Sequence, residues 1–156
     1  NKIDTIDEIM DEDWDWINTV NLRGPFVVTK ALAKKMKEQK SGKVVSVSSI
    51  FGVVSKEKRA AYSTTKCGLI GLTKAIALDL APYNILANAV SPGFVDTELT
   101  RRVLGDKGID ELVGRIPQQR LANCKEIAKT VLFLASEHNT YITGQNIIVD
   151  GGFTSA

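Results

Sequence analysis

Two residues with proton-handling side chains, Tyr62 and Lys66, stand four positions apart in a segment that reads as the start of a helix. At this spacing two side chains share one helix face. A nearby ammonium and the positive end of a helix both favour the phenolate form of a tyrosine. Such a phenol can pass a proton to or from a substrate oxygen. By itself the pair is a weak signal, and an exposed tyrosine beside a solvated lysine explains it better.

Two other residues could complete a catalytic site around this pair. Ser49 lies thirteen residues before Tyr62, at the end of a predicted strand, where its hydroxyl could hydrogen-bond a substrate carbonyl or alcohol; the alternative is an ordinary turn serine. Pro25 follows Asn21 by four residues inside a predicted helix and has no N–H for the Asn21 carbonyl. A kink there would either leave this carbonyl free to hold a water or be merely structural.

The surrounding sequence predicts elements that bring these residues to one edge of a sheet. Helices are predicted over 12–39, 61–80 and after Asn123, and strands over 43–47, 85–90 and 146–149. Asn123 and Glu126 match a capping box, while residues 91–93 are expected to break the second strand sharply. This alternation implies a parallel sheet with right-handed crossovers, in which ligands bind beyond the carboxyl ends of the strands.

The composition excludes several classes of function. The chain has 156 residues, is 44% hydrophobic, and carries 20 basic and 18 acidic side chains for a net charge of +2, which predicts one globular domain without affinity for nucleic acid or an anionic membrane. No apolar run could span a bilayer, no signal peptide opens the chain, and no cluster has metal-ligand spacing. Cys67 and Cys124 form no close-spaced pair, so free thiols in a cytoplasmic protein are predicted.

Five segments together resemble the classical short-chain dehydrogenases/reductases. They are NLRGPF at 21–26, GKVVSVSS at 42–49, YSTTK at 62–66, NAVSPGFVDT at 88–97 and ITGQNIIVDGG at 142–152. Each motif is loose alone, but their order and spacing match the family along almost the whole chain. The resemblance implies a doubly wound Rossmann-type α/β fold, and hydride transfer between NAD or NADP and a small-molecule carbonyl or secondary alcohol. Within the family the sequence is similar to 3-oxoacyl-carrier-protein reductases and to polyol or sugar dehydrogenases.

The resemblance also implies a role for each residue of the proposed catalytic group. Tyr62 would be the general acid/base, and Lys66 would favour its ionisation and hydrogen-bond the nicotinamide ribose. Both therefore belong to the expected cofactor site. Ser49 would orient and polarise the substrate carbonyl. The Asn21 backbone carbonyl would hold a water that links Lys66 to solvent.

Further matched residues would bind the cofactor and cover the substrate. Pro92 and Gly93 would shape the wall beside the nicotinamide. Val95, through its backbone, and Thr97 would hold the carboxamide, although a helix N-cap is the alternative role for Thr97. Residues 96–120 would form the substrate lid.

The family's Gly-rich fingerprint for the dinucleotide phosphates is not found in these residues. We therefore expect residues 1–156 to be the C-terminal catalytic part of a single Rossmann-type domain whose first strands, about three βαβ steps of ~30 residues each, are missing. Such a chain would bind cofactor weakly and turn over little.

Two alternatives to an active short-chain dehydrogenase/reductase stay open. One is a catalytically inactive chain that acts only as a packing or assembly module. An exposed edge of the first strand also favours a homo-oligomer, a dimer or a tetramer. The other is a sugar epimerase or dehydratase of the extended family, which shares Tyr-x-x-x-Lys, but the position of Ser49 and the 92–97 segment argue against it.

Overall fold

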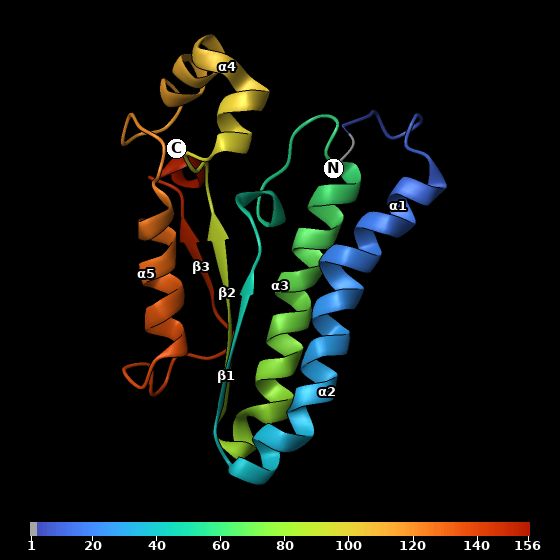
Figure 1. Ribbon diagram of the computed structural model, residues 1–156, viewed down its shortest axis with the longest axis vertical. Helices are drawn as coiled ribbons and strands as arrows, with labels where there is room; N and C mark the ends of the chain where they lie inside the picture. Colours follow the sequence, from blue (N-terminus) through green and yellow to red (C-terminus); the bar gives the residue numbers. More distant parts are fainter. Residues whose placement is uncertain (1–2) are drawn as a thin grey trace.

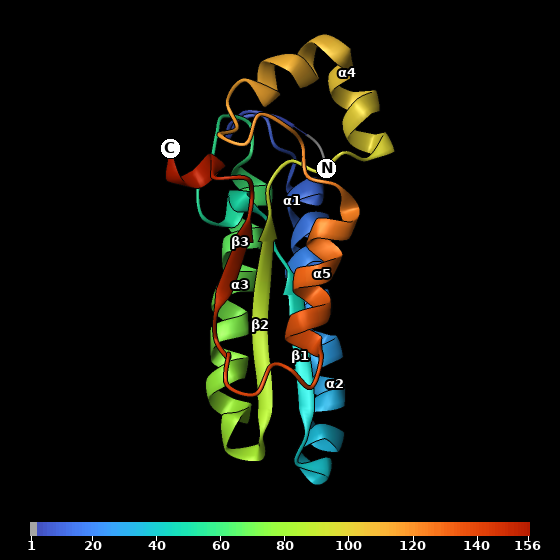
Figure 2. The ribbon, with the colours of Figure 1, turned by 90° about the vertical axis from the view of Figure 1, so that its left-hand side faces the viewer.

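The computed structural model describes residues 3–156 and shows one parallel sheet between layers of helices (Figure 1). Its strands are β1 (Gly42–Val47), β2 (Ile85–Pro92) and β3 (Asn146–Val149), in the spatial order β1–β2–β3. Helices α1 (Asp11–Asn18), α2 (Gly24–Gln39) and α3 (Ala60–Leu80) lie on one side of the sheet, and α5 (Cys124–Ala135) covers the other (Figures 1 and 2). The predicted α/β class with a parallel sheet and flanking helices is confirmed.

The core lies where α3 packs against the central strand. Every residue of β2 from Ile85 to Ser91 is buried. The buried residues of α3 recur every three or four positions and form one stripe, as expected of a helix that covers a sheet with one face; they are Ala61, Thr65, Leu69, Thr73, Ala77 and Leu80. This packing fixes the first turns of α3, which carry Tyr62 and Lys66, against the sheet.

The long N-terminal helix, predicted over 12–39 with a kink near Asn21, is not a regular α-helix throughout. A π-helical turn, Thr19–Arg23, separates α1 from α2, and the Gly24 N–H donates to the Thr19 carbonyl five residues earlier. Pro25 stands in the first turn of α2 and has no N–H to continue the regular helical ladder. The expected kink at Asn21 is therefore a wider turn within a continuous helix, a feature common at functional sites.

The second strand is longer than predicted. Pairing with β3 continues through Ser91 and Pro92, which lie opposite Ile148 and Val149, and the Gly93 N–H donates to the Val149 carbonyl at 2.9 Å. The prediction that residues 91–93 break the strand was wrong. A proline is tolerated here because it occupies the last position of the strand, where one missing N–H costs little pairing.

The segment between β2 and α5 projects beyond the carboxyl ends of the strands (Figures 1 and 2). It contains α4 (Glu98–Val113), which consists of two helical pieces joined at Gly105, whose φ of 63° lies in the left-handed region.

Asn123 and Glu126 form the predicted capping box at the start of α5. Both cysteines are free and exposed. No helix in residues 3–156 is long and apolar enough to cross a membrane.

Candidate functional site

The turn after β1 gives its two serines different hydrogen bonds. Ser48 donates from Oγ to the Lys66 carbonyl at 2.9 Å, so its hydroxyl proton is already used in a hydrogen bond to α3. Ser49 is only 8% exposed, and its Oγ accepts the Phe51 N–H at 3.1 Å. Among the described residues its own hydroxyl proton meets no acceptor. Ser49 can therefore donate that proton to a bound oxygen, which Ser48 cannot do.

Tyr62 and Lys66 share the face of α3 that borders this turn. The Lys66 Nζ donates to the Val47 carbonyl at 3.0 Å and lies 5.6 Å from the centre of the Tyr62 ring. Burial lowers the pKa of the Lys66 ammonium. The helix and the turn fit closely, since a Cβ on Gly52 would come within 2.8 Å of the Lys66 carbonyl oxygen. The structure thus brings the serine turn and the Tyr–Lys pair together.

Asn21 reaches the same part of α3 through its side chain. Its Nδ2 donates to Thr65 Oγ1 at 3.2 Å, and Thr65 Oγ1 donates to the Tyr62 carbonyl at 2.9 Å. Thr65 is completely buried. The sequence analysis predicted a role for the backbone carbonyl of Asn21, not for its side chain. The water that this carbonyl would hold stays a prediction. The contact with Thr65 was missed, because nothing in the local sequence distinguishes Thr65 from an ordinary helical threonine.

At the end of β2, Gly93 lies against the residue that follows β3. A Cβ on Gly93 would stand 2.7 Å from both Cα and Cβ of Asp150, so only glycine fits. The Asp150 carboxylate accepts the N–H groups of Gly152 and Thr154 and the Thr154 hydroxyl. Pro92 and Gly93 therefore lie at the carboxyl edge, next to a turn that these bonds hold in place. Their contact with a nicotinamide stays a prediction.

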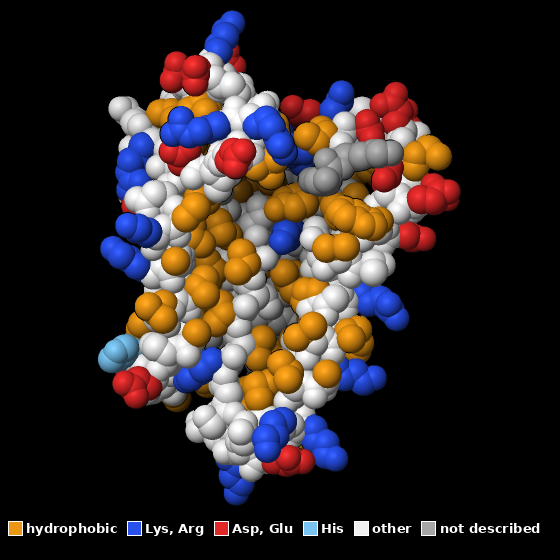
Figure 3. All heavy atoms as spheres, viewed as in Figure 1, with side chains coloured by type: hydrophobic (Ala, Val, Ile, Leu, Met, Phe, Trp, Pro, Cys, Tyr) orange, Lys and Arg blue, Asp and Glu red, His pale blue; other side chains and the backbone are white. Residues whose placement is uncertain are grey.

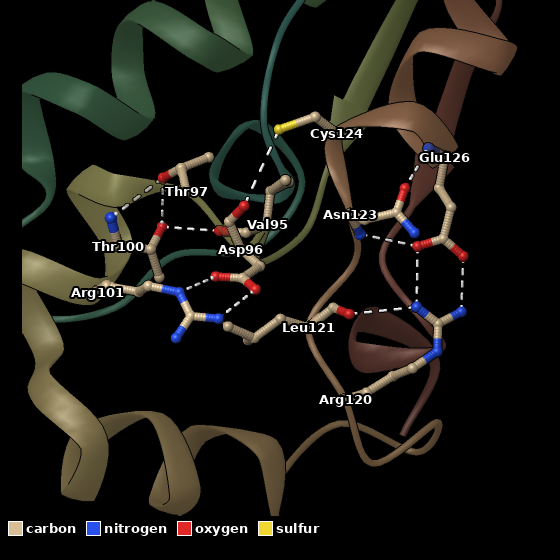
Figure 4. A network of polar contacts seen from close by, with 10 residues as sticks. All are labelled: Val95, Asp96, Thr97, Thr100, Arg101, Arg120, Leu121, Asn123, Cys124 and Glu126. Atoms are coloured by element: carbon tan, nitrogen blue, oxygen red, sulfur yellow. Dashed lines mark hydrogen bonds and ion pairs between the residues drawn. The ribbon is translucent and has the colours of Figure 1, made fainter.

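Thr97 caps α4, the alternative role considered for it (Figure 4). Its Oγ1 accepts the Thr100 N–H at 3.1 Å and lies 2.9 Å from the Thr100 hydroxyl. Thr100 Oγ1 in turn donates to the Val95 carbonyl at 2.8 Å. The Val95 carbonyl is thus engaged within the protein, and a contact of the Val95 backbone with a carboxamide stays a prediction.

Two ion pairs lie at the ends of the predicted lid (Figure 4). Arg101 donates from Nε and Nη2 to the Asp96 carboxylate at 2.7 and 2.6 Å. Arg120 holds Glu126 in the same two-point manner at 2.9 and 2.7 Å, and Glu126 also accepts the Asn123 N–H. The Arg120 guanidinium, together with that N–H, lowers the pKa of the Glu126 carboxyl to about 2. The first pair lies within the start of the segment, and the second joins its end to the first turn of α5.

A row of aromatic rings leads away from Tyr62 under the lid. The Phe51 ring lies 6.3 Å from the Tyr62 ring and 6.2 Å from Phe94, and Phe94 lies 5.1 Å from Phe153, each pair edge to face. Sequence reasoning missed this row because its members are 43 and 59 residues apart along the chain. Only the position of Phe51, two residues after Ser49, offered a signal.

A groove about 520 Å³ in volume runs between α2 and β1 on the face shown in Figure 3, where apolar side chains border a hollow. Asn21, Val47 and Lys66 line one part of it, and the rest is lined mostly by apolar side chains of α2 and β1, with Thr29, Lys43 and Ser46 among them. Among the described residues β1 pairs only with β2, so its other edge borders this groove. Of residues 3–156, no three His, Cys, Asp or Glu side chains are grouped so that they could hold a metal ion.

Comparisons with known proteins match nearly the whole chain. A family profile described as enoyl-(acyl carrier protein) reductase matches residues 2–154. The 3-oxoacyl-[acyl-carrier-protein] reductases of Thermotoga maritima and Aquifex aeolicus are 42% and 45% identical, over 91% and 90% of this chain and 57% and 56% of their own lengths. The chain therefore spans little more than half the length of these relatives.

Solved structures agree closely with the fold. ElxO with NADP bound has a TM-score of 0.94 at 31% identity, and the match covers 100% of this chain and 64% of that one. A gluconate 5-dehydrogenase from Burkholderia cenocepacia J2315, in complex with NADP and tartrate, also has a TM-score of 0.94, at 35% identity, over 100% and 61% of the two chains.

Proposed function

Because this chain belongs to the short-chain dehydrogenase/reductase family, we propose that it carries the catalytic centre of an oxidoreductase acting on a carbonyl or secondary alcohol. The observation that carries the proposal is the arrangement of Ser49, Tyr62 and Lys66. A buried serine with a free hydroxyl proton lies in the turn that packs on the Lys66 turn of α3, and its neighbour Phe51 contacts Tyr62. These are the donors that a carbonyl oxygen needs when it becomes an alcohol.

Each side chain has a defined task in the reduction direction. Ser49 donates a hydrogen bond to the carbonyl oxygen and polarises it. As the carbonyl carbon gains its new C–H bond, the π electron pair moves to oxygen, and Tyr62 gives its phenolic proton to that oxygen. The resulting phenolate is stabilised by the Lys66 ammonium, whose Nζ lies 5.6 Å from the ring centre. Oxidation of an alcohol runs through the same steps in reverse.

The cofactor of the reaction would be NAD or NADP, which supplies or accepts the hydride when bound. The residues present fit its nicotinamide half. The Lys66 ammonium has three N–H donors and uses one of them on Val47, which leaves two for the ribose hydroxyls. Lys66, with Tyr62, would bind the ribose side, and the segment of Pro92, Gly93, Val95 and Thr97 would hold the nicotinamide. The relatives solved with NADP support this assignment.

Residues 96–120 would close over the substrate, which we expect to be a small molecule. This segment includes α4 and stands at the carboxyl ends of the strands, where ligands of such sheets bind. The chain would act as a homo-oligomer, since α2 exposes apolar side chains that a partner could cover; they are Phe26, Val27, Val28 and Leu32.

A second candidate function is an assembly module without catalysis. Two observations support it. The chain spans little more than half the length of its relatives, and within residues 3–156 one edge of β1 has no strand partner and borders a mostly apolar groove. Parallel strand edges with apolar surroundings favour association with another chain.

One experiment separates the two functions. The 156-residue chain is assayed for nicotinamide-dependent carbonyl reduction alone and fused behind the N-terminal part of the Thermotoga maritima relative. The catalytic proposal expects the fusion to reduce 3-oxoacyl, sugar-acid or acyloin carbonyls. A correctly folded fusion that binds cofactor and reduces none of them would favour the assembly module.

A further inference from the structure

A second cavity, about 650 Å³ in volume, opens beside the proposed catalytic centre. It lies between the loop after β1 and the lid segment, and the aromatic row of Phe51, Phe94 and Phe153 lines it. Tyr62 adjoins the first ring of this row, at 6.3 Å between ring centres. A substrate whose carbonyl reached Tyr62 would therefore lay the rest of its body along these rings.

The charged side chains of this cavity are predominantly basic. Lys56, Arg59 and Arg115 line it, against a single acidic side chain, Glu111. The Arg59 guanidinium lies over Phe51, 5.9 Å from the ring centre, and the Arg115 guanidinium lies over Phe153 at 5.7 Å. The two arginines thus stand at opposite ends of the aromatic row.

These basic groups are free to bind a ligand. Within residues 3–156 neither arginine nor Lys56 forms an ion pair, whereas Arg101 and Arg120 are held by carboxylates. A guanidinium placed over an aromatic ring keeps its N–H donors available, and their planar fork matches the two oxygens of a carboxylate or phosphate. An aromatic wall that ends in unpaired guanidinium groups fits a molecule with an apolar body and an anionic end.

We infer that this cavity selects anionic substrates, in which the reacting carbonyl or alcohol is joined through an apolar body to a carboxylate or a phosphate. Arg115, beyond the end of the row remote from Tyr62, binds the anionic group, and Arg59 assists near the catalytic end. The reaction of such a substrate rests on the proposed function, but its binding does not.

The test measures equilibrium binding of two matched carbonyl compounds to the 156-residue chain by ligand-observed NMR. Para-acetylbenzoate and para-acetylbenzamide differ in the charge at one end and share the aromatic ketone. We expect the carboxylate to bind about tenfold more tightly, because hydrogen bonds to a charged group are the stronger ones. Arg115→Gln should abolish that preference and leave amide binding unchanged. Arg102→Gln, on α4 but outside the cavity lining, is the control and should change neither.

Further variants define the inference. Arg115→Lys keeps the charge without the planar fork, so it should retain part of the preference for the carboxylate. Para-acetylphenyl phosphate distinguishes the two anion classes: tighter binding than the benzoate assigns a phosphate substrate, and weaker binding a carboxylate. Equal affinity for benzoate and benzamide, or a preference for the carboxylate that survives Arg115→Gln, would overturn the inference.

The outcome is separable from that of the proposed function. Charge-selective binding without any hydride transfer in the fusion would leave the anion site standing and remove the catalytic proposal. Carbonyl reduction without charge selectivity would do the opposite.

Discussion

The side chain of Asn21 donates a hydrogen bond to the hydroxyl of Thr65, 44 residues away, and so ties the π-helical turn to the helix that carries Tyr62. The Thr65 hydroxyl in turn donates a hydrogen bond to the Tyr62 carbonyl. The two bonds place a buried polar link one residue before Lys66. Asn21 can therefore hold the Tyr–Lys turn through its side chain, whatever its carbonyl binds.

Replacing Thr65 should loosen this link. Thr65→Val keeps the shape and leaves the Asn21 amide without its partner, so the free energy of unfolding should fall by about 1–3 kcal/mol. Thr65→Ser, which restores the hydroxyl, should recover most of the loss. Thr73→Val is a matched control, since Thr73 is equally buried and bonds only the Leu69 carbonyl of its own helix. Denaturant unfolding measures all three, and an equal effect of the two valine variants would show that the link to Asn21 contributes nothing.

Removal of the Tyr62 hydroxyl should abolish catalysis and leave the fold unchanged. In the fusion that reduces carbonyls, Tyr62→Phe should lower kcat by about 10²–10⁴-fold, the range for loss of a general acid. Tyr141→Phe is the control, because that ring is 93% exposed and distant in sequence from the turn. Near-normal reduction by the Tyr62 variant would refute the assignment of Tyr62 as the proton donor.

The 156-residue chain alone should bind NAD and NADP only weakly. The reason is that residues 1–156 contain no Gly-rich turn whose N–H groups could receive the dinucleotide phosphates. Titration with the reduced cofactors NADH and NADPH, followed by dihydronicotinamide fluorescence, measures this, with the Thermotoga maritima relative as the positive control. A low-micromolar dissociation constant would contradict the expectation and show that these residues suffice for cofactor binding.

Position 93 should require glycine because Asp150 leaves no room for a side chain there. Gly93→Ala places a methyl group 2.7 Å from the Asp150 Cα, so backbone must shift, and we expect a loss of about 1–3 kcal/mol in the free energy of unfolding. Gly71→Ala is the opposite case, since nothing lies within 4 Å and alanine is the better helix former, by up to about 1 kcal/mol. Thermal unfolding should therefore move in opposite directions for the two variants, and a neutral Gly93→Ala would contradict the close contact.

Stability should decline in acid through Glu126. The pKa of this carboxyl is lowered from 4.5 to about 2, so its contribution is complete above pH 4.5 and is lost as the pH falls toward 2. Glu126→Gln should be less stable than the parent at neutral pH, and the difference should shrink through this interval. Glu137→Gln, at an exposed position after α5, serves as the control. A difference that stays constant with pH would mean that the charge of Glu126 is irrelevant to stability.

Local patterns predicted much of this structure. The strands 43–47 and 146–149, the helix 61–80 and the capping box at Asn123 follow from periodicity and turn chemistry, and all are found within a residue or so. The end of β2 was misjudged because Pro92 is a strong local signal for a break, whereas pairing with β3, distant in sequence, carries the strand through it.

The residues of the candidate site likewise fall into those that local motifs predict and those that only tertiary packing brings together. Its central side chains belong to short motifs, so their proximity could be expected from the parallel topology. Thr65, the aromatic row and the two unpaired arginines belong to no motif and meet only through tertiary packing. The sequence therefore indicates the kind of chemistry more readily than the kind of substrate.

The register of β1 also determines whether the catalytic site could tolerate insertions or deletions in this strand. Val47 pairs with Val90, and the Ser48 N–H donates to the Val90 carbonyl. The pairing of β1 with β2 therefore fixes the positions of Ser48 and Ser49. Deleting one residue within β1 would move Ile50 into the place of the free hydroxyl. Inserting one would keep a serine there but put Val47 where Ser48 anchors α3. Lineages of this protein should accordingly accumulate exchanges of residues in β1 while its length stays constant.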